Sequence, residues 1–296
     1  MINHNKTDTG TVLHSEVDAV VVGAGFAGLY MLHLLRNQLG LKVEVFEAAD
    51  GVGGTWYWNR YPGARCDIPS HHYSYSFSEE LQQEWTWSEK YAAQPEILSY
   101  LNYVAEKFDL LRDIQFNARV TAAHFDEDNQ RWLITTDNGR CVSAKYFIPA
   151  VGTLSDANIP EFKGHGSFKG EVYVTGRWPK DGVDFTGKRV GVIGTGATAM
   201  QIIPLIAQNA AHLTVFQRTP NYAAPLLNEP MDSEVDRQVK ANYAEVRRHA
   251  WDTFAGVPFE RLKPSALAET PEQRQAHYEA CWQDGGFSLW IGSYQD

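Results

Sequence analysis

Two glycine-rich turns, each lying between a short apolar run and a segment of helical length, predict an α/β fold with two Rossmann-like dinucleotide-binding domains. The first turn covers residues 23–28 (Gly-Ala-Gly-Phe-Ala-Gly) and the second covers residues 194–199 (Gly-Thr-Gly-Ala-Thr-Ala). Each turn is followed by a second strand, and a charged residue stands 24 positions after its first glycine. Helical patterns beyond residue 230 add a helical region at the C-terminal end.

The first unit begins with the apolar run 19–22, passes through its turn, continues as a helix through Leu39 and reaches a strand at residues 42–46. This order makes a complete βαβ opening. Its glycines let the backbone approach a pyrophosphate at a helix N-terminus, and the carboxylate of Glu47 can accept hydrogen bonds from a ribose 2′-hydroxyl. The predicted nucleotide contacts here are Gly23, Gly25, Gly28 and Glu47.

The second unit repeats the order, with a strand at 190–193, a helix to about Gln208 and a strand at 213–217, but it ends on Arg218. A carboxylate at this position would repel a 2′-phosphate, whereas a guanidinium pairs with it. The second unit is therefore predicted to prefer NADP(H). Its predicted contacts are Gly194, Thr195, Gly196, Ala199 and Arg218.

Composition indicates a cytoplasmic protein of about two domains, with 296 residues, 44% of them hydrophobic, and a net charge of -10. The negative charge argues against nucleic acid as a partner, and no apolar run has the length of a membrane span. Cys66, Cys141 and Cys281 are too widely spaced for a metal site, and they favour a reducing compartment over a disulfide framework. The adjacent pair at 71–72 is a lone pair of histidines, so no metal is predicted.

The remaining chain gives a coarser prediction. A Gly- and aromatic-rich segment at 51–77 follows neither the helical nor the strand period, and such long irregular segments are usually functional. Periodicity predicts further elements: helices at 95–108, 233–254 and 271–283, and a small antiparallel set of strands at 120–125, 132–136 and 141–148 with a hairpin turn at 137–139. A Gly- and Pro-punctuated connector runs from residue 155 to residue 187.

Residues 53–67 (Gly-Gly-Thr-Trp-Tyr-Trp-Asn-Arg-Tyr-Pro-Gly-Ala-Arg-Cys-Asp) are too specific for an ordinary loop. They resemble the motif of type I Baeyer-Villiger monooxygenases, and all six fixed positions of that motif are met. These positions are Gly54, Trp56, Tyr61, Pro62, Gly63 and Asp67. The resemblance extends over nearly the whole chain, including residues 73–77, 94–98, 190–196 and 216–220, and it is strongest to the phenylacetone and steroid monooxygenase branch.

A second fingerprint of the family covers residues 168–179, but its histidine is replaced by Val174. In the family this segment links the two nucleotide domains and is associated with the handling of NADPH. Valine supplies neither donor nor acceptor. The coupling of NADPH use to oxygen insertion is therefore in question, and a tolerated variant in a packed linker is the alternative.

The resemblance implies that NADPH reduces FAD, that oxygen adds to the flavin as a peroxide, and that a ketone becomes an ester or lactone. Fixed cations and bound NADP+ in a closed cavity would favour this chemistry. The resemblance also implies a mobile arginine downstream of this chain, paired with a catalytic Asp67. Besides the glycine turn and Glu47, the implied FAD contacts are Gly54, Thr55, Trp56, Trp58, Asp67, Tyr73 and Val120, and the further NADP contacts are Arg65, Cys66, Asp67 and Thr219.

Each of these assignments has an alternative. Aromatic core packing is the alternative for the tryptophans at 56 and 58, and a turn-capping role after Pro-Gly is the alternative for Asp67. A flavin monooxygenase that oxidises nitrogen or sulfur is the alternative enzyme. A nucleotide-binding fragment without turnover of its own is the alternative that is not an enzyme.

Family members continue well past residue 296, and the second nucleotide unit has only two clearly predicted strands. A two-stranded parallel sheet leaves its edges unpaired and its faces uncovered. We therefore expect an N-terminal portion of the enzyme, truncated or one half of a split protein. The predicted division is a polar arm (1–16), an FAD-binding domain (17–154, with small antiparallel strands near 114–148), a linker (155–186), an NADP-binding domain (187–228) and a helical region (229–296).

Overall fold

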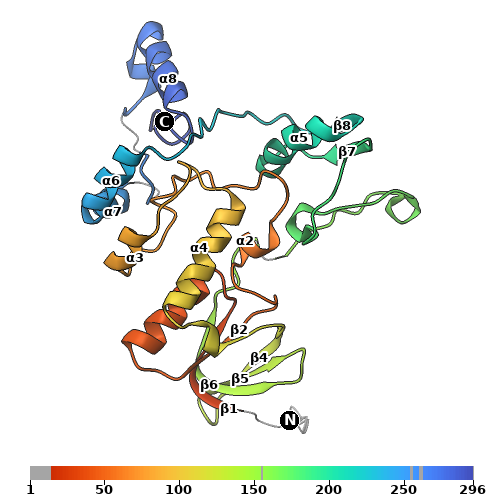
Figure 1. Cartoon of the computed structure of the whole chain (residues 1–296), viewed down its shortest axis with the longest axis vertical. Coiled ribbons are helices and arrows are strands. Elements are labelled where there is room, and N and C mark those ends of the chain that lie inside the picture. Colours follow the sequence, from red (N-terminus) through yellow and green to blue (C-terminus); the bar gives the residue numbers. More distant parts are fainter. Residues whose placement is uncertain (1–14, 155, 254–255, 260–262, 296) are drawn as a thin grey trace, which may run out of the picture. The chain divides into compact units, whose positions relative to one another are not determined.

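The computed structural model describes residues 15–154, 156–253, 256–259 and 263–295. The chain divides into two compact units, and each unit holds one of the two glycine turns (Figure 1). The first unit comprises Met1–Asn59 and Leu98–Trp178, and the second comprises Arg60–Ile97 and Pro179–Asp296. The motif at 53–67 therefore crosses from one unit to the other after Asn59.

The first unit contains a six-stranded sheet in the order β3-β2-β1-β6-β5-β4. Its strands are β1 (Ser15–Val22), β2 (Val43–Phe46), β3 (Ile114–Gln115), β4 (Val120–Asp126), β5 (Arg131–Thr136) and β6 (Cys141–Pro149). The predicted antiparallel pairing of β4, β5 and β6 is confirmed. These strands are not a separate set, however, because β6 also pairs in parallel with β1 and so joins them to the nucleotide-binding strands.

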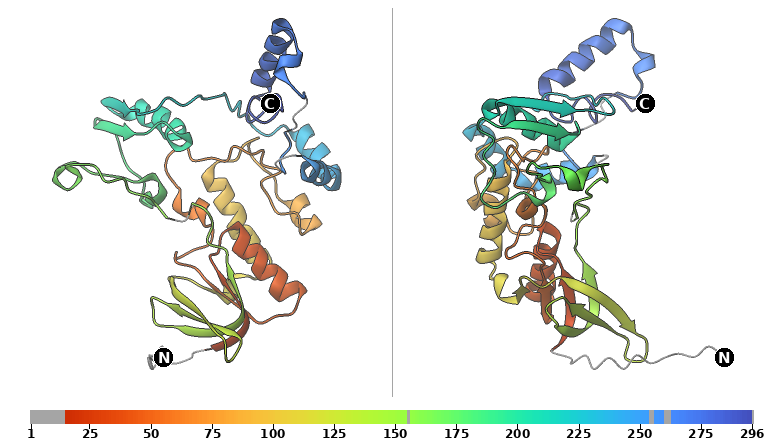
Figure 2. Two further views of the ribbon diagram at one scale, coloured as in Figure 1. Left: turned by 180° about the vertical axis from the view of Figure 1, so that it is seen from behind. Right: turned by 90° about the vertical axis from the view of Figure 1, so that its right-hand side faces the viewer.

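Helices α1 (Phe26–Leu32) and α4 (Gln94–Lys107) lie on the same side of this sheet (Figure 2). α1 continues as the π-helix η1 (His33–Gln38), so the helix predicted through Leu39 is present with Leu39 as its C-cap. The core cluster of the sheet is wholly apolar and comprises Val17, Val20, Phe46, Ala118, Ile134, Val142 and Ala144. This burial explains why the second half of β1, residues 19–22, is a continuous apolar run, as expected for a parallel strand covered on both faces.

Shorter helical segments complete the first unit. The irregular region at 51–77 contains one helical turn, α2 (Thr55–Trp58), which the period of the sequence did not predict. The 3₁₀ segments are η2 (Leu111–Asp113), η3 (His165–Ser167) and η4 (Thr175–Arg177). The predicted connector after residue 155 therefore holds only single 3₁₀ turns among its described residues.

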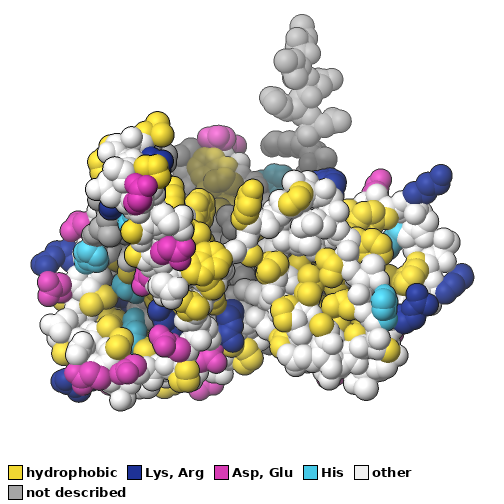
Figure 3. All heavy atoms as spheres, turned by 90° about the horizontal axis from the view of Figure 1, so that it is seen from above, with side chains coloured by type: hydrophobic (Ala, Val, Ile, Leu, Met, Phe, Trp, Pro, Cys, Tyr) yellow, Lys and Arg dark blue, Asp and Glu magenta, His cyan; other side chains and the backbone are white. Residues whose placement is uncertain are grey.

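The second unit contains a parallel pair of strands, β7 (Arg189–Ile193) and β8 (His212–Phe216), joined by α5 (Ala197–Asn209). Five large apolar side chains of this region remain exposed, namely Ile193, Met200, Leu205, Val215 and Phe216. Figure 3 shows hydrophobic side chains, in yellow, across the right-hand part of the face, over the region of β7, β8 and α5. Within the described residues the second sheet is thus a two-stranded opening of a Rossmann fold, as predicted.

The remaining helices of the second unit are α3 (Glu79–Glu84), α6 (Ser233–Ala241), α7 (Tyr243–Asp252), η5 (Ala266–Ala268) and α8 (Pro271–Asp284). The single helix predicted over 233–254 is two helices, because Asn242 has φ -130° and ψ 24°, outside the helical region. The end of that prediction, Phe254, lies outside the described residues. α8 begins as predicted, with a capping box between Thr270 and Gln273. Across the described part of the chain, every helix is too short or too polar to cross a membrane.

Candidate nucleotide-binding sites

The two glycine turns have the same backbone geometry. Gly23 and Gly194 have φ values of 100° and 103°, in the region that favours glycine. The N–H of Gly23 donates to the Phe46 carbonyl at 2.8 Å, and the N–H of Gly194 donates to the Phe216 carbonyl at 2.9 Å. In both units, therefore, the first glycine bonds to the last residue of the neighbouring strand.

The helix that follows each turn is capped by a glycine in extended conformation. Gly25 has φ -83° and ψ -165°, Gly196 has φ -76° and ψ -173°, and neither cap supplies a side-chain hydrogen bond. The first N–H groups of a helix have no partner within the helix and carry the positive end of its dipole. Both turns consequently leave backbone donors where a phosphate would bind.

The glycines of the first turn are also fixed by packing. A Cβ on Gly28 would overlap the carbonyl oxygen of Gly23, and a Cβ on Gly23 would lie 2.6 Å from the carbonyl oxygen of Ala150. A Cβ on Gly54 would lie 2.9 Å from the Cα of Gly25. The structure therefore brings Gly23, Gly25 and Gly28 together with Gly54, which opens the predicted flavin loop.

Glu47 is only 5% exposed and already bonds to the first turn. Its carboxylate accepts the N–H of Ala24 at 2.7 Å and the N–H of Ala49 at 2.8 Å. A carboxylate has about four acceptor positions, so two backbone bonds leave capacity for a ribose hydroxyl. The residue predicted as a ribose ligand thus also ties the end of β2 to the glycine turn.

The other predicted flavin contacts of the first unit lie in segments that adjoin Gly54 in sequence or run beside Glu47 in the fold. Thr55, Trp56 and Trp58 form α2, directly after Gly54, with Trp56 buried and Trp58 half-buried. The Ala118 N–H donates to the Glu47 carbonyl at 2.9 Å, so the segment that leads into Val120 runs beside the end of β2. Burial of Trp56 is consistent with both the packing and the flavin interpretation.

The predicted contacts of the second turn are open. A Cβ on Gly194 or Gly196 would meet no heavy atom within 4 Å, and Ala199 already carries a side chain at the position equivalent to Gly28. The Thr195 hydroxyl accepts a hydrogen bond from the Gln217 amide at 2.9 Å. Arg218 and Thr219 follow β8 and are exposed.

The segment Arg65–Asp67 belongs to the second unit and is anchored through Arg65. The Arg65 guanidinium donates to Glu89 Oε2 at 2.5 Å and to the Tyr91 carbonyl at 2.7 Å. Burial raises the pKa of the Cys66 thiol to about 12, so this thiol is not ionised near neutral pH. The Asp67 side chain, in contrast, is exposed.

Tyr73, predicted to lie beside the flavin, is half-buried in the second unit, where its N–H donates to the Pro69 carbonyl at 3.1 Å. Val174, which replaces the family histidine, is the half-buried N-cap residue of η4. Its carbonyl accepts the N–H of Arg177 at 2.9 Å, a bond that any residue could make. The role of the Val174 side chain stays a prediction.

Two residues of these sites were missed from the sequence. The Arg177 guanidinium lies 5.9 Å from the ring centroid of Trp58 and donates to Asp156 at 2.6 Å. Gln201 of α5 contacts the Tyr61–Arg65 segment. No local pattern links Arg177 to Trp58 or Gln201 to the Tyr61–Arg65 segment, because these partners lie more than a hundred positions apart in the sequence.

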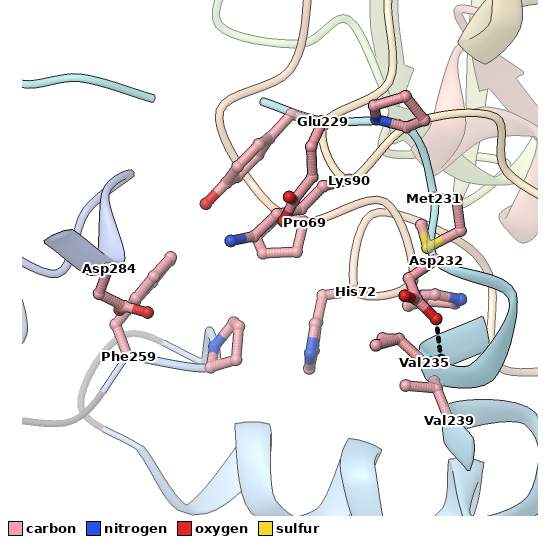
Figure 4. Close-up of a pocket in the computed structure, with 14 residues that line it drawn as sticks. Pro69, His72, Lys90, Glu229, Met231, Asp232, Val235, Val239, Phe259 and Asp284 are labelled. Atoms are coloured by element: carbon pink, nitrogen blue, oxygen red, sulfur yellow. Dashed lines mark hydrogen bonds between the residues drawn. The ribbon is translucent and has the colours of Figure 1, made fainter. Parts of the chain in front are cut away.

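A separate pocket of about 370 Å³ lies in the second unit and contains none of the predicted cofactor contacts (Figure 4). Burial lowers the pKa of His72, which points into it, to about 4. Lys90, Asp232 and Asp284 add charge to a lining that also includes apolar side chains such as Val235 and Phe259. Among the residues that the structure describes, no group of three metal-ligating side chains is present.

Two family models match the chain. An NAD(P)-binding Rossmann-like domain model matches residues 21–85, and an L-lysine 6-monooxygenase/L-ornithine 5-monooxygenase model matches residues 69–270. The second model covers more than half of the chain.

Two similar proteins are also monooxygenases. A Baeyer-Villiger monooxygenase of Pseudooceanicola batsensis is 44% identical over 98% of this chain and 53% of its own length. A phenazine N-monooxygenase of Lysobacter antibioticus is 42% identical over 100% of this chain and 53% of its own length. The chain thus spans about half the length of the curated relatives it matches.

Solved structures agree with the fold. A steroid monooxygenase bound to NADP is 55% identical, with a TM-score of 0.90 over 95% of this chain and 53% of that one. A closed cyclohexanone monooxygenase is 44% identical, with a TM-score of 0.93 over 96% of this chain and 54% of that one. The chain therefore belongs to the L-lysine 6-monooxygenase/L-ornithine 5-monooxygenase family, whose model matches more than half of it, and it also resembles Baeyer-Villiger monooxygenases at 44% identity over nearly its whole length.

Proposed function

We propose that this chain supplies the FAD- and NADP(H)-binding portions of a Baeyer-Villiger monooxygenase, which inserts one oxygen of O2 beside a ketone carbonyl to give an ester or lactone. The observation that carries the proposal is the pair of matched glycine turns, one ending in a buried carboxylate and the other in an exposed guanidinium. The relatives named above support the reaction class. Ketone and O2 are accordingly the proposed partners.

In the first unit, the turn at 23–28 and α2 would hold FAD, which when bound supplies the redox chemistry and the activation of oxygen. The open N–H groups at the start of α1 would bind its pyrophosphate. Glu47 would accept a bond from the adenosine ribose while keeping its two backbone partners. The close approach of Gly25 and Gly54 would keep the flavin loop against the turn.

In the second unit, the N-terminus of α5 would bind the NADP pyrophosphate. The Arg218 guanidinium makes no hydrogen bond or ion pair with the described residues, so it is available to a 2′-phosphate. A guanidinium pairs with phosphate through parallel hydrogen bonds, which explains the predicted preference for NADP(H) over NAD(H). Thr219 would extend this contact.

Asp67 is the proposed positioning carboxylate of the reaction centre. Its side chain is exposed, so it can pair with an arginine supplied from outside these residues. The raised pKa of Cys66 keeps this neighbouring thiol neutral at neutral pH, so Asp67 is the negatively charged residue of the segment. Val120 and Tyr73 remain proposed contacts to the flavin nucleotide.

The proposed domains are residues 17–154 for FAD, 155–186 as linker, 187–228 for NADP and 229–296 as a helical region. We propose a cytoplasmic location, in keeping with three buried cysteines that form no disulfide among the described residues. We also propose that turnover requires the polypeptide that corresponds to the other half of the relatives.

An N-oxidising monooxygenase is the second candidate. The phenazine N-monooxygenase at 42% identity and the model named for lysine and ornithine oxygenases favour it. The Trp-Pro pair at 178–179 favours oxygen insertion into ketones, and Trp178 is buried against Tyr173 at a centroid distance of 5.7 Å.

The test starts with FAD bound per chain, read from the absorbance spectrum, and continues with NADPH, labelled O2 and either cyclohexanone or phenazine. A labelled lactone supports the proposal. A labelled N-oxide without lactone transfers the function to the second candidate. Bound FAD with no product until a C-terminal polypeptide is added assigns the chain to a two-part enzyme.

A further inference from the structure

Helix α5 packs directly on the Tyr-Pro-Gly part of the motif. Gly63 has φ 81°, and a Cβ there would lie 2.6 Å from the Gln201 carbonyl oxygen and 2.9 Å from Leu205 Cδ1. The carbonyl belongs to the helix backbone and cannot rotate away. Glycine at position 63 therefore allows the helix of the second nucleotide turn to rest on this segment.

The side chain of Gln201 joins two residues of the same segment. The Tyr61 hydroxyl donates to Gln201 Oε1 at 2.7 Å, and Gln201 Nε2 donates to the Arg65 carbonyl at 3.1 Å. Tyr61 is 9% exposed, so its hydroxyl has little access to water as an alternative partner. The amide thus uses its acceptor and its donor on partners four positions apart.

These contacts connect the nucleotide turn to the reaction-centre segment. Gln201 lies five positions after Gly196, within the first turns of α5, and a helix transmits a displacement of its N-terminus along its length. The Arg65 carbonyl lies two positions before Asp67. Among the described residues the Asp67 carboxylate has no hydrogen bond of its own, so its placement depends on the backbone around it.

The segment has a second set of anchors on its other side. The Arg65 guanidinium bonds to Glu89 and the Cys66 N–H donates to the Ala92 carbonyl at 3.0 Å. Loss of the Gln201 side-chain bonds would therefore leave the segment attached through these anchors, with only the packing of Gly63 and the contact of Tyr61 with Thr198 remaining on the side of α5.

We propose that Gln201 is a positioning residue that couples dinucleotide binding at residues 194–199 to the placement of Arg65–Asp67. This inference rests on the proposed function, since it needs NADP(H) at the second turn. It predicts that binding of NADP+ orders residues 60–68 only when the Gln201 amide is present.

The test compares Gln201→Leu, which removes both hydrogen bonds at similar size, with Gln208→Leu, which changes an exposed glutamine on the same helix. Hydrogen–deuterium exchange of residues 60–68 is measured with and without NADP+, beside the dissociation constant of NADP+ and the melting temperature. We expect NADP+ to slow exchange in the wild type and in Gln208→Leu, but not in Gln201→Leu. NADP+ affinity of Gln201→Leu should stay within about 3-fold, because the side chain bonds to protein rather than to the turn.

Tyr61→Phe removes the bond to Gln201 Oε1 and keeps the bond from Gln201 Nε2 to the Arg65 carbonyl, so it should reduce the NADP+-dependent slowing of exchange in part, and it serves as the test if Gln201→Leu does not fold. In the turnover assay with the complementary polypeptide, either variant should lower kcat about 5- to 10-fold with little change in the KM for NADPH, as expected from the loss of about 1 kcal/mol of hydrogen bonding. If NADP+ slows exchange equally in the wild type, Gln201→Leu and Tyr61→Phe, this inference is wrong while the proposed function stands. A wild type that binds no NADP+ overturns the proposed function and this inference with it.

Discussion

The two glycine turns share one backbone geometry but differ in their surroundings. The glycines of the first turn meet the Ala150 carbonyl and the Gly54 backbone, and its carboxylate is buried. The glycines at 194 and 196 face open space, and Arg218 is exposed. The first turn is therefore constrained by close packing around its glycines, whereas the glycines of the second turn, within the described residues, have no such close neighbours.

The largest difference in stability between the two turns is expected from substitutions at their sixth positions, residues 28 and 199. Gly28→Ala places a Cβ inside the Gly23 carbonyl oxygen, and a backbone atom cannot move aside. We expect a destabilisation above about 4 kcal/mol and loss of bound FAD, measured by circular dichroism melting and absorbance. Ala199→Gly, the matched change, should cost only about 1 kcal/mol through helix propensity. Similar losses in the two variants would contradict the comparison.

The next largest effect is expected for Glu47→Gln. The amide keeps one acceptor oxygen but turns an NH2 group toward one of the two backbone N–H donors, leaving a buried donor unpaired. We expect a loss of about 1–3 kcal/mol in the free energy of unfolding, from denaturant titration. Glu44→Gln on the same strand serves as the control, since its partners Ser15 and Arg140 are only partly buried. A Glu47→Gln protein as stable as the wild type would show that packing does not constrain this turn.

Arg218→Gln should leave stability unchanged, because the side chain is exposed. It should instead reduce the preference for NADPH over NADH by about 10-fold or more, the effect of losing one charge-assisted pair. The ratio of kcat/KM for the two nucleotides, or of their dissociation constants, measures it. Arg189→Gln, an exposed arginine on β7, should keep the wild-type ratio. If Arg218→Gln instead lowered the melting temperature and left the ratio for NADPH and NADH unchanged, Arg218 would serve stability rather than nucleotide binding, which would contradict the comparison of the two turns.

The smallest effect concerns acid stability of the second unit. Burial, followed by the charges of Arg247, His71 and His249, lowers the pKa of His72 to about 4 from 6.5. The unfolded protein binds a proton on this group before the folded one does, so its contribution to stability is present above about pH 6.5 and lost as the pH falls toward 4. Denaturant midpoints of His72→Gln should fall less than those of the wild type between pH 7 and pH 4.5. His165→Gln, at an exposed position, should follow the wild type.

Local patterns predicted most of the fold. The periodicity of α4 and α5 depends on neighbouring residues, so these helices were predicted with near-correct bounds. The apolar run predicted at 19–22 is only the second half of β1, which begins at Ser15. The parallel pairing of β6 with β1 was not predicted, because it joins segments more than a hundred residues apart. β3 is only two residues long, and α3 is a short helix capped by Ser78, so neither produces a periodic signal.

The site divides in the same way. The glycines, Glu47 and Arg218 stand at fixed spacings and are visible as a motif. Gln201 is not, because its two partners lie about 140 positions earlier and only the folded chain brings them to its amide. Motif residues stand at fixed distances in the sequence because the backbone must adopt one geometry at the ligand. Residues that bond to the motif from another part of the fold have no fixed sequence distance from it, so the sequence alone does not reveal them.

The close approach of Gly25 and Gly54 has a consequence for protein engineering. A Cβ at position 54 would lie 2.9 Å from the Cα of Gly25, and a Cβ at position 25 would lie 3.3 Å from the Cα of Gly54, so each position is restricted by the backbone of the other. A mutational library that varies the flavin loop should therefore keep both glycines. Homologues are expected to show the same joint restriction.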